Sequence, residues 1–169
     1  MLLAELVSVL APLQLSGSLQ KQITGIVYDS RLVEPGNLFI AVPGFVHDGH
    51  DFIAEAAVRG AVAAIISRKV LVPEQLTSIS VTDSRGAMGM VADLYFGHPS
   101  RKLRVIGVTG TNGKTTTTFL IDNLLRMAGH QAGIVGTVHV RAGELRLEAV
   151  RTTPEALDLQ RWLASMVEA

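Results

Sequence analysis

The feature that most constrains the fold is a short apolar run that leads into a glycine-rich loop. The run Leu103–Val108 is rich in β-branched residues, and the segment Phe119–Ala128 has the apolar spacing of a helix. Between them, the loop Gly110-Thr-Asn-Gly113 is followed directly by Lys114 and Thr115. Buried strand, glycine-rich loop, Lys-Thr and helix is the order of a phosphate-binding loop. The sequence therefore predicts an α/β unit that binds a nucleotide.

The physical reason for this pattern lies in the backbone of the loop. Glycine lets successive N–H groups turn toward one point, and the following helix directs its unpaired N-terminal amides to the same place. There Lys114 would reach the β- and γ-phosphates of ATP, and the Thr115 hydroxyl would ligate Mg2+. The candidate ATP contacts are Gly110, Thr111, Asn112, Gly113, Lys114, Thr115 and Thr116. Val108 stands where such a loop usually begins with glycine, so a turn that binds nothing is the alternative.

Composition narrows the fold class and the partners. Of 169 residues, 48% are apolar and 5% aromatic, which favours α/β layers built from Val, Ile, Leu and Ala. The formal net charge is zero and no basic block occurs, so a nucleic-acid partner is not expected. Cysteine is absent, which excludes disulfides and thiolate metal sites and is compatible with a cytoplasmic location.

The apolar N-terminus is predicted to be a helix of a soluble protein. Glu5 interrupts it and no basic region precedes it, which argues against a signal sequence. One helical stripe is formed by Leu2, Leu3, Leu6, Val9 and Leu10. No stretch approaches the roughly 18 unbroken apolar residues expected of a membrane span.

The first hundred residues alternate between apolar runs and helical patterns. Strands are predicted near residues 23–28, 38–42, 61–66 and 78–81, with helices from Asp51 to Arg59 and after Asp83 or Ser84. The turn-forming group Gly97-His-Pro-Ser100 then suggests a hinge. We therefore predict one domain over residues 1–100 and a second over residues 101–169.

The second unit is predicted to be incomplete. After the nucleotide loop, a strand is expected over Ala132–Val140, a partner strand over Leu145–Val150, and a helix with Thr153 as N-cap and Pro154 in its first turn. A nucleotide-binding α/β domain needs several parallel strands covered on both faces, and these residues supply too few. We expect the chain to be the N-terminal portion of a longer protein.

Three segments together carry a resemblance to a known family. They are Asp29-Ser-Arg31 with the following Pro35–Gly49 region, the loop Val108–Thr116, and Thr152-Thr-Pro154. In this order and spacing they resemble the Mur ligases, which extend the peptide stem of the bacterial cell-wall precursor. The resemblance implies an N-terminal uridine-binding α/β domain followed by the start of a P-loop ATP-binding α/β domain. It also makes valine at position 108 a family trait.

The resemblance implies a substrate and a reaction. Ser30, Phe45, Val46 and His47 would hold the UDP group of UDP-N-acetylmuramoyl-L-alanyl-D-glutamate, and Thr152 and Thr153 would contact its sugar-peptide part. With Lys114 and Mg2+ neutralising the γ-phosphate, a substrate carboxylate would form an acyl phosphate, which the amine of meso-diaminopimelate or L-lysine would convert into an amide. Because the family's amino-acid-binding domain lies further along, we expect no ligase activity from this chain alone.

Two other functions remain open. A sister Mur ligase, which adds D-alanyl-D-alanine, carries a similar Asp-Ser-Arg pattern, and a non-catalytic nucleotide- or UDP-binding module is a different class.

His47 and His50 have a spacing that a metal site could use, but the absence of a supporting cluster favours a solvated loop. His139, on an expected alternating strand, is interpreted as an ordinary surface or core histidine.

Overall fold

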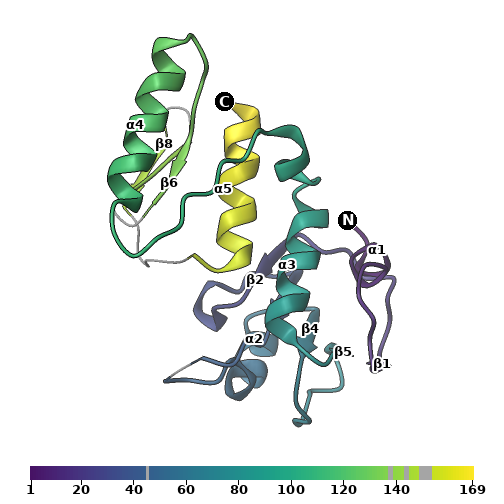
Figure 1. The fold of residues 1–169 in the computed structure, drawn as a ribbon. Helices are drawn as coiled ribbons and strands as arrows, with labels where there is room; N and C mark the ends of the chain where they lie inside the picture. The colour runs from purple at the N-terminus through teal and green to yellow at the C-terminus, as the bar shows by residue number, and fades with distance from the viewer. Residues whose placement is uncertain (45, 137–138, 143–144, 149–153) are drawn as a thin grey trace. The chain divides into compact units, whose positions relative to one another are not determined.

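The computed structural model describes residues 1–44, 46–136, 139–142, 145–148 and 154–169. They divide into two compact units, Met1–Tyr95 and Phe96–Ala169. In Figure 1 the first unit runs from purple to teal and the second from teal to yellow. Among the described helices, none has the length and apolar character needed to span a lipid bilayer. Each unit is considered separately.

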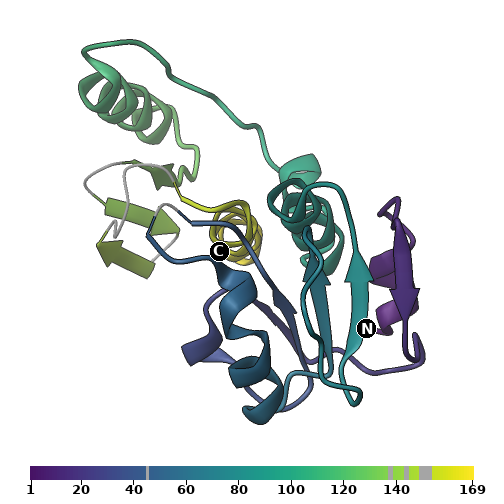
Figure 2. The same cartoon turned by 90° about the horizontal axis from the view of Figure 1, so that it is seen from below.

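The first unit is built on a mixed sheet with the strand order β1-β5-β4-β3-β2. The strands are β1 (Gln14–Ser16), β2 (Gly25–Val27), β3 (Asn37–Ile40), β4 (Ala63–Ile66) and β5 (Thr77–Ser80). The helical segments are α1 (Leu3–Val7), η1 (Ser30–Leu32), η2 (Gly49–Phe52), α2 (Ile53–Val58) and α3 (Ser84–Tyr95). Strands β2 to β5 run parallel, and β1 joins the edge antiparallel to β5, as Figure 2 shows for the adjacent strands.

The apolar strands form because both faces of the sheet are covered. Phe39 of β3 and Ala64 of β4 belong to a core cluster with Ile53 and Ala56 of α2. Their neighbours in sequence point to the other face, and Leu38 and Ile40 are nevertheless fully buried. α3 contacts β4 and α1 contacts α3. This explains why β3 and β4 read as continuous apolar runs and not as alternating ones.

Four details of the first unit differ from the sequence predictions. The N-terminal helix covers only Leu3–Val7. β1 forms in a stretch for which no strand was predicted, because its backbone pairs with the edge of β5, a non-local contact. The helix expected from Asp51 begins as the 3-10 turn η2. Asp51 is not its N-cap; Asp48 is, since its carboxylate accepts a hydrogen bond from the His50 N–H.

The second unit combines helices with a small antiparallel sheet. Its elements are η3 (Pro99–Lys102), α4 (Lys114–Met127), β6 (Ile134–Val135), β7 (His139–Ala142), β8 (Leu145–Glu148) and α5 (Ala156–Glu168). The sheet has the order β6-β7-β8, and Figure 1 shows α4 beside it. Buried Asp122 of α4 pairs with Arg141 of β7, and Arg141 also donates to the carbonyl of Ala132 at 3.2 Å. This ion pair connects the helix to the sheet.

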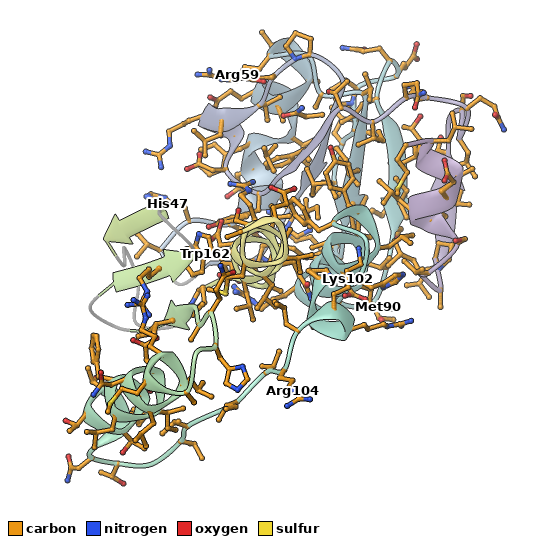
Figure 3. The ribbon with its side chains drawn as sticks, turned by 90° about the horizontal axis from the view of Figure 1, so that it is seen from above. His47, Arg59, Met90, Lys102, Arg104 and Trp162 are labelled. Carbon is orange, nitrogen blue, oxygen red and sulfur yellow. The ribbon has the colours of Figure 1, made fainter. Side chains whose placement is uncertain are left out.

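The strand predicted over residues 103–108 does not form. The segment lies between η3 and α4 without strand structure, and Val105 and Ile106 are 62% and 58% exposed. A strand is held by hydrogen bonds to a neighbour, and no described strand of this unit pairs with these residues. Arg104 points away from the ribbon in Figure 3.

The other elements of the second unit shift by a few residues. The helix after the loop begins at Lys114, five residues before the predicted start. The strand expected over residues 132–140 is divided into β6 and β7, which pair with each other antiparallel. The strand expected from Leu145 is present as β8. The last helix begins at Ala156 with Glu155 as N-cap, so Pro154 precedes it; Thr153 lies outside the described residues.

Candidate nucleotide and substrate sites

The glycine-rich loop leads directly into α4. Gly113 is the N-cap of this helix and has a φ of 80°, and Gly110 has a φ of 147°. Residues with a side chain rarely adopt these values, so the turn requires glycine. The loop is open: Thr111, Asn112 and Lys114 are exposed. α4 is fourteen residues long, and its first N–H groups lack partners within the helix, which suits an anion.

Lys114 folds back over the loop that precedes it. Its Nζ donates to the carbonyl oxygen of Gly110 at 2.5 Å and to that of Thr111 at 3.4 Å. Within α4, the Thr118 hydroxyl donates to the Lys114 carbonyl at 2.8 Å. The ammonium group therefore lies beside the loop backbone. Among the described residues, no group of three or more His, Asp or Glu side chains could hold a metal.

A second cluster of polar residues lies where the parallel strands of the first unit end. Ser30 follows β2 and Pro43 follows β3, and these two strands are neighbours in the sheet. Both segments therefore leave the sheet at its carboxyl edge, where ligands bind in open α/β sheets. Ser30 is buried, and its hydroxyl donates to Glu55 Oε2 at 3.2 Å. Glu55 also accepts from Arg59, which Figure 3 shows on the outside of the unit.

The loop between β3 and η2 forms the other part of this edge. Val46 is 85% exposed and His47 is also exposed. The His47 ring packs edge-on against Phe52 with the ring centres 6.2 Å apart. The Gly44 N–H donates to the His47 carbonyl at 3.1 Å, which closes the loop. The exposed tip is thus presented on a closed turn.

The base of this loop contains a network of charged and polar groups. Asp48 accepts from the His50 backbone at 3.0 Å and from Arg68 Nε at 2.8 Å, and its Oδ1 lies 2.6 Å from His50 Nδ1. Burial raises the pKa of Asp48, but the hydrogen bonds from His50 and Arg68 outweigh it and leave the pKa below its ordinary value. His50 itself is 3% exposed. The prediction that it belongs to a solvated loop is therefore wrong, because His50 is part of η2 and its side chain has no exposed surface.

The structure brings the predicted site residues into two groups. Ser30, Val46 and His47 follow neighbouring strands of the first unit, whereas the ATP candidates Gly110–Thr116 span the loop before α4 and the first turn of that helix. Phe45, Thr152 and Thr153 lie outside the described residues.

Sequence reasoning did not identify several residues that hold the carboxyl edge together. They are Glu55, Arg68 and Arg85, the last of which donates to the Pro43 carbonyl at 2.8 Å. The i,i+4 spacing of Glu55 and Arg59 is visible in the sequence. The contacts from Glu55 to Ser30 and from Arg68 to Asp48 join residues 25 and 20 positions apart, and no local pattern encodes them.

Comparison with known families matches most of the chain to two models. Residues 22–96 match a model described as "Mur ligase family, catalytic domain", and residues 108–169 match "Mur ligase middle domain". Among curated relatives, a UDP-N-acetylmuramoyl-L-alanyl-D-glutamate--2,6-diaminopimelate ligase of Geobacillus thermodenitrificans is 48% identical, over 86% of this chain and 29% of its own length. The ligase of the same name from Syntrophomonas wolfei is 43% identical, over 97% of this chain and 34% of its own. The chain thus spans about a third of these relatives.

Solved structures give the same fold. A structure described as a UDP-N-acetylmuramoyl-L-alanyl-D-glutamate--2,6-diaminopimelate ligase superposes with a TM-score of 0.74 and 25% identity, over 99% of this chain and 34% of that one. The MurF ligase of Thermotoga maritima in complex with ADP gives a TM-score of 0.54 and 31% identity, over 83% and 29%. The predicted α/β fold class is confirmed.

Proposed function

Because the chain belongs to the Mur ligase family, we propose that it forms the substrate- and ATP-binding part of a ligase that adds a diamino acid to UDP-N-acetylmuramoyl-L-alanyl-D-glutamate. Members of this family are ATP-dependent ligases. The names of the curated relatives favour 2,6-diaminopimelate as the added amino acid. The chain spans about a third of those relatives, so the complete reaction is proposed for a protein of their length that contains these residues. Because the proposed substrates are ATP and a nucleotide-linked precursor, a cytoplasmic location of the protein is favoured.

The observation that carries the proposal is the position of Lys114. Its ammonium lies against the loop backbone at the N-terminus of α4, where a polyphosphate would find a cation, glycine amides and the positive end of the helix dipole together. We assign the ATP contacts to Gly110–Thr116 and the uridine contacts to Ser30, Val46 and His47. The residues 1–100 and 101–169 are proposed as the corresponding domains.

The proposed reaction is an amide synthesis in two displacements. The substrate carboxylate attacks the γ-phosphorus of ATP and ADP leaves; the amine of the diamino acid then displaces inorganic phosphate. Lys114 would place its positive charge beside the γ-phosphate and so stabilise the negative charge that this group carries during the transfer. Mg2+ prefers oxygen ligands, so the Thr115 hydroxyl with phosphate oxygens of the nucleotide fits it chemically. Bound there, Mg2+ would supply further neutralisation of phosphate charge.

The proposal is tested by binding of ATP with Mg2+ to the chain, measured by isothermal titration calorimetry. We expect Lys114→Met to weaken binding by about tenfold or more, since it removes a charge-assisted hydrogen bond. Lys102→Met is the matched control, because Lys102 is an exposed lysine of η3 outside the loop. Equal affinity of the Lys114→Met and wild-type chains would contradict the assignment.

A second titration separates the proposed ligase from its sister enzyme. We expect the chain to bind UDP-N-acetylmuramoyl-L-alanyl-D-glutamate more tightly than the corresponding UDP-muramoyl tripeptide. The reverse preference would favour the ligase that adds D-alanyl-D-alanine. Absence of binding to both ligands would contradict the proposed function of the first unit.

A further inference from the structure

The exposed tip of the loop, Val46 and His47, is connected through η2 to a buried histidine that the proposed substrate contacts do not include. His50 lies in η2, its side chain has no exposed surface, and it is followed two residues later by Phe52. Phe52 in turn packs against His47 at the tip. η2 therefore joins a buried anchor to the exposed ring that we assign to substrate binding.

The hydrogen bonds of His50 identify its tautomer. The Ser67 backbone N–H donates to Nε2 at 2.9 Å, so this nitrogen is the acceptor. Nδ1 lies 2.6 Å from the Asp48 carboxylate and therefore carries the hydrogen. A proton on Nε2 would set two N–H donors against each other. The ring thus bridges the loop residue Asp48 to Ser67, the residue after β4, with a fixed direction of donation.

The same three residues have the order of a hydrolytic Asp-His-Ser triad, but the geometry excludes that role. The Nε2 lone pair is engaged by the Ser67 backbone, and the Ser67 hydroxyl lies 3.5 Å away. That hydroxyl is 3.0 Å from Ser84 Oγ, and Ser84 donates to the Ala41 carbonyl at 2.6 Å. Ser67 is therefore the donor to Ser84. The network ends on backbone and is structural.

Other contacts fix the loop to the same strand ends. The Gly49 N–H donates to the Val42 carbonyl at 3.0 Å, and a Cβ on Gly49 would lie 2.7 Å from the Val42 nitrogen. Arg68 binds both Asp48 and Asp51, at 2.8 and 2.6 Å. These outer contacts are partly exposed, which makes them individually weak. The buried His50 contacts are the ones whose loss leaves polar groups without partners.

We propose that His50 is a positioning residue for the uridine nucleotide. As the Nδ1–H tautomer it joins Asp48 to Ser67, and this holds η2 so that Val46 and His47 are presented in the binding geometry. The proposal rests on the proposed function of the first unit. Positioning matters because ordering a loop during binding costs free energy. That cost weakens the affinity for the ligand.

The test compares UDP binding by the full chain and by three variants, using isothermal titration calorimetry. His50→Ala removes both contacts, whereas His50→Gln keeps an amide group near the place of Nε2. Thr77→Val is the matched control: Thr77 is fully buried and donates to the Ser18 carbonyl, but it lies at the start of β5, on the opposite edge of the sheet. Hydrogen exchange of residues 44–50 and ATP affinity are measured on the same samples.

For His50→Ala we expect the Kd for UDP to rise by roughly tenfold or more. Exchange in residues 44–50 should become faster, and the Kd for ATP should stay the same. His50→Gln should recover part of the affinity and serves as the folded variant if His50→Ala unfolds, while Thr77→Val should bind UDP normally. Unchanged UDP affinity in both His50 variants, or an equal loss in Thr77→Val, would overturn the positioning role. If the wild-type chain itself binds no UDP, the proposed function of the unit has failed instead.

Discussion

At the scale of single residues, the carboxyl edge of the first sheet is held together by polar side chains that form hydrogen bonds with one another. Asp48 accepts from both His50 and Arg68, and Glu55 accepts from both Ser30 and Arg59. Since Ser30 gives its hydrogen to Glu55, its oxygen is left to accept from a ligand donor. A uridine nucleotide offers such donors in its base and ribose.

Asp48 makes the stability of the first unit dependent on acid. Its pKa lies below the ordinary value because the hydrogen bonds from His50 and Arg68 outweigh the opposite effect of burial. A lowered pKa in the folded state contributes stability that is complete above the unfolded-state pKa and is lost as the pH falls through the folded-state value. We expect Asp48→Asn to lower the free energy of unfolding at about pH 7, and the difference from wild type to shrink below about pH 4. Urea unfolding at both pH values measures this, and a difference that grew on acidification would contradict it.

At the scale of elements, the strands were predicted well where both covering helices are in the same unit. The runs that became β3 and β4 are apolar because both faces of the sheet are buried there, and this shows locally in the sequence. Residues 103–108 have the same local character but no strand partner among the described residues, and Val105 and Ile106 are exposed. β1 was missed for the opposite reason, since its burial pattern is exposed throughout and only its pairing with β5 makes it a strand.

The candidate sites divide in the same way. The loop before α4 and the first turn of this helix form a contiguous motif, so these candidate residues could be proposed from the sequence, although Val108 departs from the usual pattern. The contacts of Ser30 with Glu55 and of His50 with Ser67 depend on the fold, because they join residues on different elements. The burial of His50 could not be predicted from a loop rich in polar residues.

The apolar side of α4 gives a prediction about stability. Leu124 is 65% exposed, whereas Leu157 of α5 is 1% exposed. We expect Leu124→Lys to change the free energy of unfolding of this chain by no more than about 0.5 kcal/mol, as for ordinary surface positions. Leu157→Ala should lower it by about 2–5 kcal/mol, since it leaves a cavity in a packed core. Chemical denaturation followed by circular dichroism tests both, and a large loss from Leu124→Lys would mean that this side of α4 is packed in solution.

At the scale of the whole molecule, the division into two compact units separates the two proposed activities. The sheet of Met1–Tyr95 is closed on both faces by helices from the same stretch of chain. Strand β1 covers one edge of it, and the core cluster is formed entirely by residues between Val33 and Leu76. The conditions for independent folding are therefore met within this unit.

We expect residues 1–95 to fold alone and to bind UDP with an affinity close to that of the full chain. They should not bind ATP, because the loop before α4 lies in the other unit. Cooperative urea unfolding and calorimetry of this shorter chain provide the measurement. Phe39→Ala, which empties a fully buried position of β3, should lower its stability by about 3–5 kcal/mol and serves as evidence that the core is formed. A shorter chain without cooperative unfolding would contradict the division.

The contact of Lys114 with the carbonyl oxygens of Gly110 and Thr111 has a consequence for ligand choice. The ammonium already donates hydrogen bonds to these carbonyls, so an anion that binds it must replace them as the acceptor. Binding is then an exchange of partners, and its free energy is the difference between phosphate and carbonyl as acceptors. Because charge-assisted hydrogen bonds are stronger than those to neutral carbonyls, we expect this exchange to be more favourable for a polyphosphate with several negative charges than for a singly charged anion. We expect the loop to select ligands by their charge density, and to ignore the base that the phosphates carry.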